Sequence, residues 1–149
     1  MLQAMRKRME DDKGFTLIEL MVVVLIIAIL IAIAIPTFLG LRQRAQDRAA
    51  QSDLRNALTA GKAFFTDGDT YTGFTAAAGQ AIEPSLTWVA GGPAVQGSVH
   101  VKLVSATDLV LSTLSASGSF FCIADSSTVG TNRGDTDAVT FAGCGPDDW

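Results

Sequence analysis

The most uneven feature of the chain is an unbroken apolar run near its N-terminus. Sixteen consecutive residues, Leu20–Ile35, are all apolar, and the stretch from Phe15 to Ile35 contains only two polar side chains, Thr16 and Glu19. As a helix with a rise of about 1.5 Å per residue, this stretch is about 31 Å long, close to the thickness of a bilayer core. The pattern predicts a transmembrane helix over residues 15–36.

Beyond Pro36 the chain mixes polar and apolar residues at helical spacing. The apolar residues recur every three or four positions and so share one helix face. They are Ala50, Leu54, Ala57, Leu58, Gly61, Phe64 and Phe65. On the polar face Arg44 and Asp47 are three residues apart and can pair. We predict one long helix over residues 15–65, loosened at Pro36 and Gly40, with the apolar face of its second half under a sheet.

Residues 66–149 carry turn and strand signals. Asp67–Asp69 favour a turn that ends the helix, and the segment 71–93, rich in Gly and Pro, is predicted to be a connecting loop. Four segments predict strands: 99–103, 108–114, 119–125 and 138–141. Short links between the first three favour antiparallel neighbours. The predicted fold class is therefore α+β, a long N-terminal helix packed on a four-stranded antiparallel sheet.

Charge and cysteine content add two expectations. The net charge of −4 does not favour nucleic-acid binding. Both cysteines, Cys122 and Cys144, lie in the predicted soluble part. They should form a disulfide if that part is outside the cytoplasm, and two separate thiols are the alternative.

The first fourteen residues form a short charged leader. Its basic residues are Arg6, Lys7, Arg8 and Lys13. No small-residue cleavage site follows Ile35, so an ordinary secretory signal is not indicated and the apolar segment is expected to be kept. The basic leader favours a cytoplasmic N-terminus, although Arg42, Arg44 and Arg48 on the other side of the span weaken this charge bias.

The residues from Gly14 to Glu19, GFTLIE, with the basic leader before them and the apolar run to Pro36 after them, resemble the cleavage and methylation signal of type IV prepilins. The resemblance covers roughly residues 1–50. It implies a type IV pilin-like fold with a leader peptide over residues 1–14. It also implies cleavage between Gly14 and Phe15 by a prepilin peptidase, N-methylation of Phe15, and filament assembly through Phe15, Glu19 and Pro36.

Glu19 is an unusual residue for a membrane helix, because a lone carboxylate in hydrocarbon costs several kcal/mol. The resemblance implies a partner for it. Cleavage creates an α-amine at Phe15, and Glu19 of one subunit meets this amine on a neighbouring subunit. Such a pair would fix axial register more than it adds stability. The alternative is a glutamate close enough to the helix end to reach the lipid headgroups.

The resemblance further implies that residues 66–149 are a globular head with a disulfide-bounded, outward-facing C-terminal loop. Asp125, Asp135 and Asp137 lie around that loop, and related pseudopilins hold calcium in a comparable region. Solvated acids are preferred, since no ligand spacing is diagnostic. For Asp67 and Asp69 a plain turn is likewise preferred to a calcium loop. No metal and no cofactor are therefore predicted.

No enzyme is predicted, because the chain has no catalytic motif and its single histidine, His100, lies in a strand pattern with an expected exposed side chain. The leading prediction is the major structural subunit of a type IV pilus. Its precursor would cross the cytoplasmic membrane once, and the mature protein would form an extracellular filament.

The predicted partners are further copies of the chain, the prepilin peptidase, the membrane, and a pilus assembly platform with its ATPase. One alternative is a pseudopilin of a type II secretion or DNA-uptake system. Another is a bitopic membrane protein that keeps residues 1–14 and presents a ligand-binding domain.

Overall fold

The computed structural model describes residues 14–145 and residue 149. The predicted leader, residues 1–14, therefore lies outside the described residues except for Gly14. The elements are α2 (Leu17–Gly68), α3 (Ala76–Ile82), β1 (Trp88–Ala90), β2 (Val99–Val104), β3 (Asp108–Leu114), β4 (Phe120–Ser126) and β5 (Gly130–Gly134). The chain divides into two units, Met1–Gly40 and Leu41–Trp149, and α2 contributes to both.

The described part of the first unit is the N-terminal half of α2. Its side chains are exposed all along the helix. Pro36 lies inside the helix without ending it. Because proline has no N–H to donate, one backbone hydrogen bond is missing there. The Thr37 hydroxyl donates to the Ile33 carbonyl one turn earlier, at 3.2 Å, and adds a hydrogen bond beside the proline.

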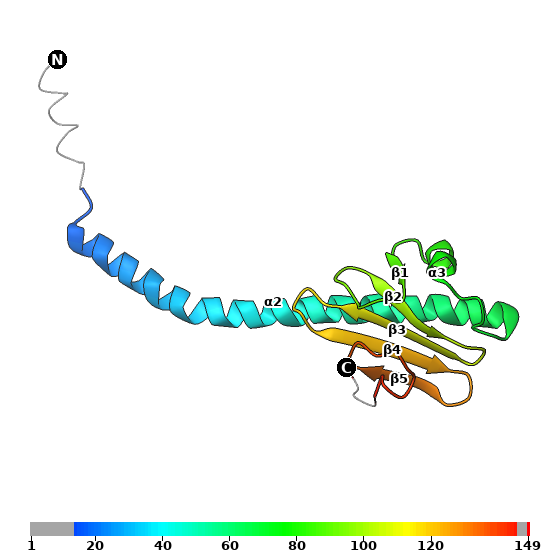
Figure 1. Cartoon of the computed structure of the whole chain (residues 1–149). Coiled ribbons are helices and arrows are strands. Elements are labelled where there is room, and N and C mark those ends of the chain that lie inside the picture. Colours follow the sequence, from blue (N-terminus) through cyan, green and yellow to red (C-terminus); the bar gives the residue numbers. More distant parts are fainter. Residues whose placement is uncertain (1–13, 146–148) are drawn as a thin grey trace, which may run out of the picture. The chain divides into compact units, whose positions relative to one another are not determined.

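The second unit is a five-stranded sheet lying along the C-terminal half of α2, with the strands in the order β1-β2-β3-β4-β5 and α3 beside β1 (Figure 1). β2 to β5 form an antiparallel meander, and β1 pairs with β2 in parallel. The predicted architecture, a long helix on a C-terminal sheet, is confirmed. The predicted number of strands is wrong: there are five rather than four.

The last predicted strand, 138–141, is also wrong, since no residue of this segment is in a strand. The strand after β4 is β5, which lies in the predicted link. Its sequence, GTNRG, has no apolar alternation, but β5 is an edge strand, which pairs with β4 alone among the described strands, and an edge tolerates polar residues. Gly130 opens β5 with a φ of 110°. Because this value suits glycine, the turn between β4 and β5 can be tight.

The segment 71–93, predicted to be a loop, contains two elements that the sequence did not predict, α3 and β1. α3 has Thr75 as its N-cap residue, and the Thr75 hydroxyl accepts a hydrogen bond from the Ala78 N–H. β1 reaches the sheet as a parallel strand, in register with Val99–Val101 of β2. Trp88 is the first residue of β1, and its ring lies against Gly79 of α3.

The predicted apolar face of α2 is confirmed as one wall of the core. Ala50, Leu54, Ala57, Leu58 and Gly61 are buried, and Phe64 and Phe65 pack partly buried beside them. The helix approaches the sheet closely at Gly61, where an added Cβ would lie 2.4 Å from a methyl carbon of Leu109.

Both faces of the sheet are covered. On β3, Leu109 and Leu111 join the core under α2, whereas Val110 between them packs with Cys122, Ala124 and Ala138 on the other face. Successive side chains of a strand point to opposite faces. The apolar run in β3 therefore reflects burial on two sides, with helix α2 on one side and the C-terminal segment on the other.

Candidate functional site

The candidate site lies where α2 begins. Thr16 precedes the first helical residue, and its hydroxyl accepts a hydrogen bond from the Glu19 N–H at 3.3 Å. The Glu19 carboxylate in turn accepts from the Thr16 N–H at 2.9 Å and from the Thr16 hydroxyl at 2.7 Å. This reciprocal pattern is a capping box, which satisfies helix N–H groups that have no partner within the helix. The sequence already carried its signal, a threonine followed three residues later by a glutamate.

The residues of the predicted cleavage site are accessible. Phe15 is 83% exposed, and Gly14 and Glu19 are exposed as well. The hydrogen bonds of Glu19 go to Oε2, so Oε1 has no partner among the described residues. Gly14, Phe15 and Glu19 line one open hollow, whereas Pro36 lies about 25 Å further along the helix. Of the four residues predicted for cleavage and filament assembly, the structure therefore brings together three and leaves Pro36 apart.

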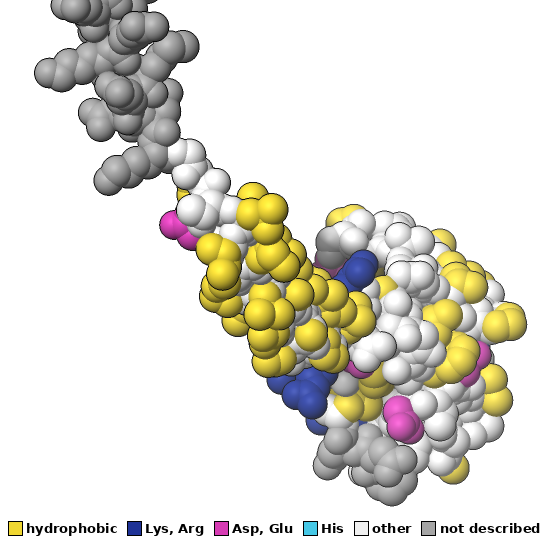
Figure 2. Space-filling model, turned by 90° about the vertical axis from the view of Figure 1, so that its left-hand side faces the viewer, with side chains coloured by type: hydrophobic (Ala, Val, Ile, Leu, Met, Phe, Trp, Pro, Cys, Tyr) yellow, Lys and Arg dark blue, Asp and Glu magenta, His cyan; other side chains and the backbone are white. Residues whose placement is uncertain are grey.

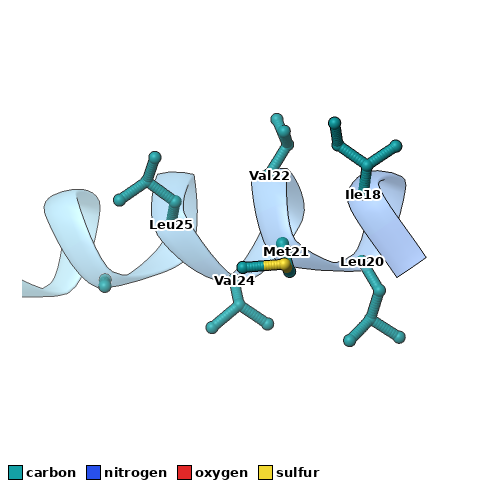
Figure 3. Close-up of a pocket in the computed structure, with 7 residues that line it drawn as sticks. Ile18, Leu20, Met21, Val22, Val24 and Leu25 are labelled. Carbon is teal, nitrogen blue, oxygen red and sulfur yellow. The ribbon is translucent and has the colours of Figure 1, made fainter.

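The helix after this site is apolar on all sides. Ile18, Val22 and Leu25 project from one side of α2, and Leu20 and Val24 from the opposite side (Figure 3). In Figure 2 hydrophobic side chains cover the visible face of this part of the helix. An apolar patch of this size on a protein surface indicates contact with lipid or with other chains.

By length and composition α2 can cross a membrane. Its most apolar window of 18 residues has a mean hydropathy of 3.3, and none of that window is buried. A helix that is hydrophobic all round has to be covered on every side, by a bilayer or by a bundle of helices.

The predicted disulfide is confirmed in the head. Cys122 of β4 is bonded to Cys144, with the two Cα atoms 5.8 Å apart. Both residues are fully buried. The bond fixes the C-terminal segment to the face of the sheet opposite α2, so the two sulfurs are not separate thiols.

Asp125 is not the solvated loop acid that was expected. It is buried in β4, and its carboxylate accepts hydrogen bonds from the Tyr71 hydroxyl at 2.6 Å and from the Thr131 hydroxyl, while Lys62 of α2 lies 3.0 Å away. Burial raises the pKa of Asp125, but hydrogen bonds from Thr131, Tyr71 and Lys62 outweigh it, so the pKa lies below its ordinary value. The pKa of Tyr71 is raised by burial and by this carboxylate. The cluster ties the end of α2 to the β4–β5 hairpin.

Asp137 belongs to a second cluster. Its Oδ1 lies 2.7 Å from Nζ of Lys102, whose side chain is only 3% exposed, and Oδ1 also accepts from the Ser112 hydroxyl at 2.9 Å. Its Oδ2 accepts from the Ala94 N–H at 3.2 Å. Burial raises the pKa of Asp137, but the bonds from Lys102, Ser112 and Ala94 hold it below its ordinary value. Asp135 is exposed, so the three acids predicted to surround one loop do not converge. The described residues contain no group of three or more His, Cys, Asp or Glu side chains arranged to hold a metal ion.

His100 is buried, only 2% exposed, so the expectation of an exposed histidine is wrong. Its Nε2 accepts from the Val95 N–H at 3.2 Å, which leaves the proton on Nδ1 to be donated to the Gly91 carbonyl at 2.7 Å. The histidine is enclosed because β1 and the loop after it cover this end of β2. Both ring nitrogens hold that loop.

Comparison with known proteins bears on the N-terminal site. The prokaryotic N-terminal methylation motif matches residues 9–35, which include Gly14, Phe15 and Glu19. The type IV major pilin protein PilA of Myxococcus xanthus is 41% identical over 98 residues, 66% of this chain and 44% of that protein. The chain therefore resembles the type IV pilin family. The 98 matched residues exceed the 52 residues of α2, so the chain resembles PilA beyond the helix alone.

Two further relatives show the range of the family. The type IV wide pilus major component PilA4 of Thermus thermophilus is 44% identical over 69 residues, 46% of this chain and 53% of that protein. The type II secretion system core protein G of Vibrio cholerae is 44% identical over 55 residues, 35% of this chain and 38% of that protein. The matches thus span about half or less of each relative's length. No solved structure matched the chain.

Proposed function

We propose that this protein is the major structural subunit of a type IV pilus. The main support for the proposal is the exposed apolar helix, which follows an accessible Gly14-Phe15 bond and whose first turn contains Glu19 in a capping box. The longer match to a protein named a major pilin than to a secretion core protein, 98 against 55 residues, favours a pilus over a secretion pseudopilus.

The chain would be processed and divided as follows. Residues 1–14 form a leader that a prepilin peptidase removes on the cytoplasmic side, and the new N-terminal residue Phe15 is N-methylated. Residues 15–65 form the long helix, which spans the cytoplasmic membrane over about residues 15–36. Residues 66–149 form the head on the far side of the membrane. Exposure of Gly14 and Phe15 supports this order, because a peptidase needs an accessible bond.

Assembly would exchange lipid for protein around the apolar helix. Lipid chains are as apolar as leucine, so the gain comes from helix packing rather than from escape from water. Glu19 enters the bundle with Oε2 already occupied by Thr16 and Oε1 free to accept. The Phe15 amine of a neighbouring subunit supplies a donor with the opposite charge. Pairing removes the cost of two separate buried charges and fixes the axial register.

Work for extraction from the membrane would come from an assembly platform and its ATPase. The pilin itself would catalyse no reaction and need no cofactor or metal. The mature subunits would form an extracellular filament in which the apolar helices make the centre and the heads make the surface.

The decisive experiment is N-terminal sequencing and intact-mass analysis of protein sheared from the cell surface. Filaments whose subunit begins at methyl-Phe15 are expected. Gly14→Val should leave the uncut chain in the membrane, whereas Gly40→Val, at a glycine with equally open surroundings, should be processed normally. A chain that starts at Met1 and stays in the membrane would favour the bitopic protein.

The second candidate is a pseudopilin of a secretion system, favoured by the match to the Vibrio cholerae core protein G. Deleting the gene separates the two candidates. Loss of surface filaments with normal protein secretion fits the pilus, and loss of secretion with filaments unchanged fits the pseudopilus.

A further inference from the structure

The filament mechanism gives no role to three arginines that follow the apolar part of α2. Arg42, Arg44 and Arg48 are all exposed, and none forms a salt bridge with a described residue. The acid nearest to them on the helix, Asp47, instead accepts a hydrogen bond from the Ser117 hydroxyl on the head. The Arg44–Asp47 pair predicted from the spacing is therefore not formed, and no acid among the described residues engages any of the three guanidinium groups.

Their position along the helix points to a membrane boundary. The exposed apolar run does not stop at Pro36 but continues to Leu41, which is 59% exposed. From Leu20 to Leu41 the only polar side chain is Thr37. This stretch is about 33 Å long as a helix, close to the hydrocarbon thickness of about 30 Å. When Glu19 lies at the cytoplasmic boundary, Arg42 therefore lies at the opposite one.

Their directions around the helix narrow the choice of partner. At about 100° per residue, Arg42 and Arg44 point about 160° apart, on nearly opposite sides of the helix, whereas Arg44 and Arg48 point about 40° apart. The three span about 9 Å along the axis, close to the depth of one headgroup layer. A neighbouring helix meets one side of α2, but a headgroup layer surrounds it and can meet cations on both sides at one depth.

The chemistry fits the phosphate group. Guanidinium pairs with phosphate through two parallel hydrogen bonds and gives up hydration more readily than an ammonium group. Basic residues on the translocated side also weaken the charge bias that orients the helix, so these arginines carry a cost that a lipid contact offsets. We propose that Arg42, Arg44 and Arg48 bind the phosphates of anionic phospholipids in the leaflet facing away from the cytoplasm and so fix the depth of the precursor helix before assembly. This lipid proposal takes one premise from the proposed function, namely that the apolar segment spans the membrane.

The test uses the full precursor in bilayers of phosphatidylcholine and phosphatidylglycerol in equal amounts, with native mass spectrometry of the lipids that remain bound on release. The precursor is expected to keep phosphatidylglycerol in preference. Each arginine near an anionic surface contributes about a five-fold preference. R42Q/R44Q/R48Q should therefore lose the share that these three residues supply and keep only the share of the basic leader. The Lys triple variant R42K/R44K/R48K should retain most of the preference. Circular dichroism verifies that both variants remain helical, as glutamine and lysine favour helix.

Arg55 supplies the matched control. It is exposed on the same helix but lies about 20 Å beyond Arg42, outside the headgroup layer. Arg55→Gln should leave the lipid preference unchanged, whereas Arg44→Gln should lower it about five-fold.

Three outcomes would overturn the proposal: no preference in the natural precursor, an unchanged preference in the Gln triple variant, or an equal loss in Arg55→Gln. If the Gln triple variant keeps its lipid preference while its filaments dissociate at lower temperature, the arginines serve contacts between subunits instead. The assay needs neither cleavage nor filaments. If the precursor shows no lipid preference but still yields methyl-Phe15 filaments, only the lipid proposal is refuted. If the precursor shows the preference but is never cleaved, only the proposed pilin function is refuted.

Discussion

The buried ion pair between Lys102 and Asp137 allows a quantitative prediction for the head. The Lys102 side chain is 3% exposed and that of Asp137 25% exposed. Removing one partner of a buried pair leaves a charge without compensation, which costs about 3–5 kcal/mol. We expect Asp137→Ala to lower the free energy of unfolding by about 3–4 kcal/mol, toward the lower end because Asp137 is partly solvated.

Removing the lysine instead of the aspartate should lower the free energy of unfolding by less. Lys102→Met leaves Asp137 with its hydrogen bonds from Ser112 and Ala94 and with access to water. A loss of about 1–2 kcal/mol is expected, since the remaining charge is still hydrogen-bonded. Combining both changes removes the charges together, and buried pairs can often be replaced by apolar residues at little cost. The double variant should therefore be about 2 kcal/mol more stable than the sum of the single changes indicates.

The assay is urea unfolding of the full chain in a neutral detergent under non-reducing conditions, followed by tryptophan fluorescence, to which the buried Trp88 contributes. Equal slopes of unfolding free energy against urea concentration show that the variants expose the same amount of surface on unfolding. Strict additivity of the two changes would refute the argument, because it would mean that the two groups do not interact. A larger loss for Lys102→Met than for Asp137→Ala would refute it as well, because the lysine is the more deeply buried partner.

Three further predictions concern the head and the assembly site. The folded pKa values of Asp125 and Asp137 lie below the ordinary 3.8, so their contribution to stability is complete above about pH 4 and is lost as the pH falls through the folded values. Urea unfolding between pH 2 and pH 7 should show this decrease in the free energy of unfolding, and Asp137→Asn should make the decrease smaller. Replacing both cysteines by alanine opens a loop closed across 22 positions and should cost about 3 kcal/mol in the same unfolding assay; an unchanged midpoint would contradict this. Glu19→Gln should abolish filaments on electron micrographs while the precursor accumulates and the head unfolds as before, whereas normal filament numbers would remove the proposed role of the charge.

The sequence by itself determined the features whose signals are local. An apolar run long enough for a bilayer, the 3.6-residue pattern of Leu54 and Leu58, and the short links around β3 each specify their element within a few residues. The capping box of Thr16 and Glu19 is also local, so its spacing alone could have predicted it. The disulfide needed only two cysteines and an oxidising location.

Tertiary structure decided the features whose causes lie far along the chain. The polar segment Gly130–Gly134 is a strand because it pairs with the edge of β4. In the same way, β1 is a strand because it pairs with the edge of β2. His100 and Lys102 alternate with apolar residues as exposed side chains would, yet both are enclosed by the loop that follows β1. A pattern within one strand records its own alternation, but burial depends on which distant segments cover each face, and that is settled only when the chain is folded.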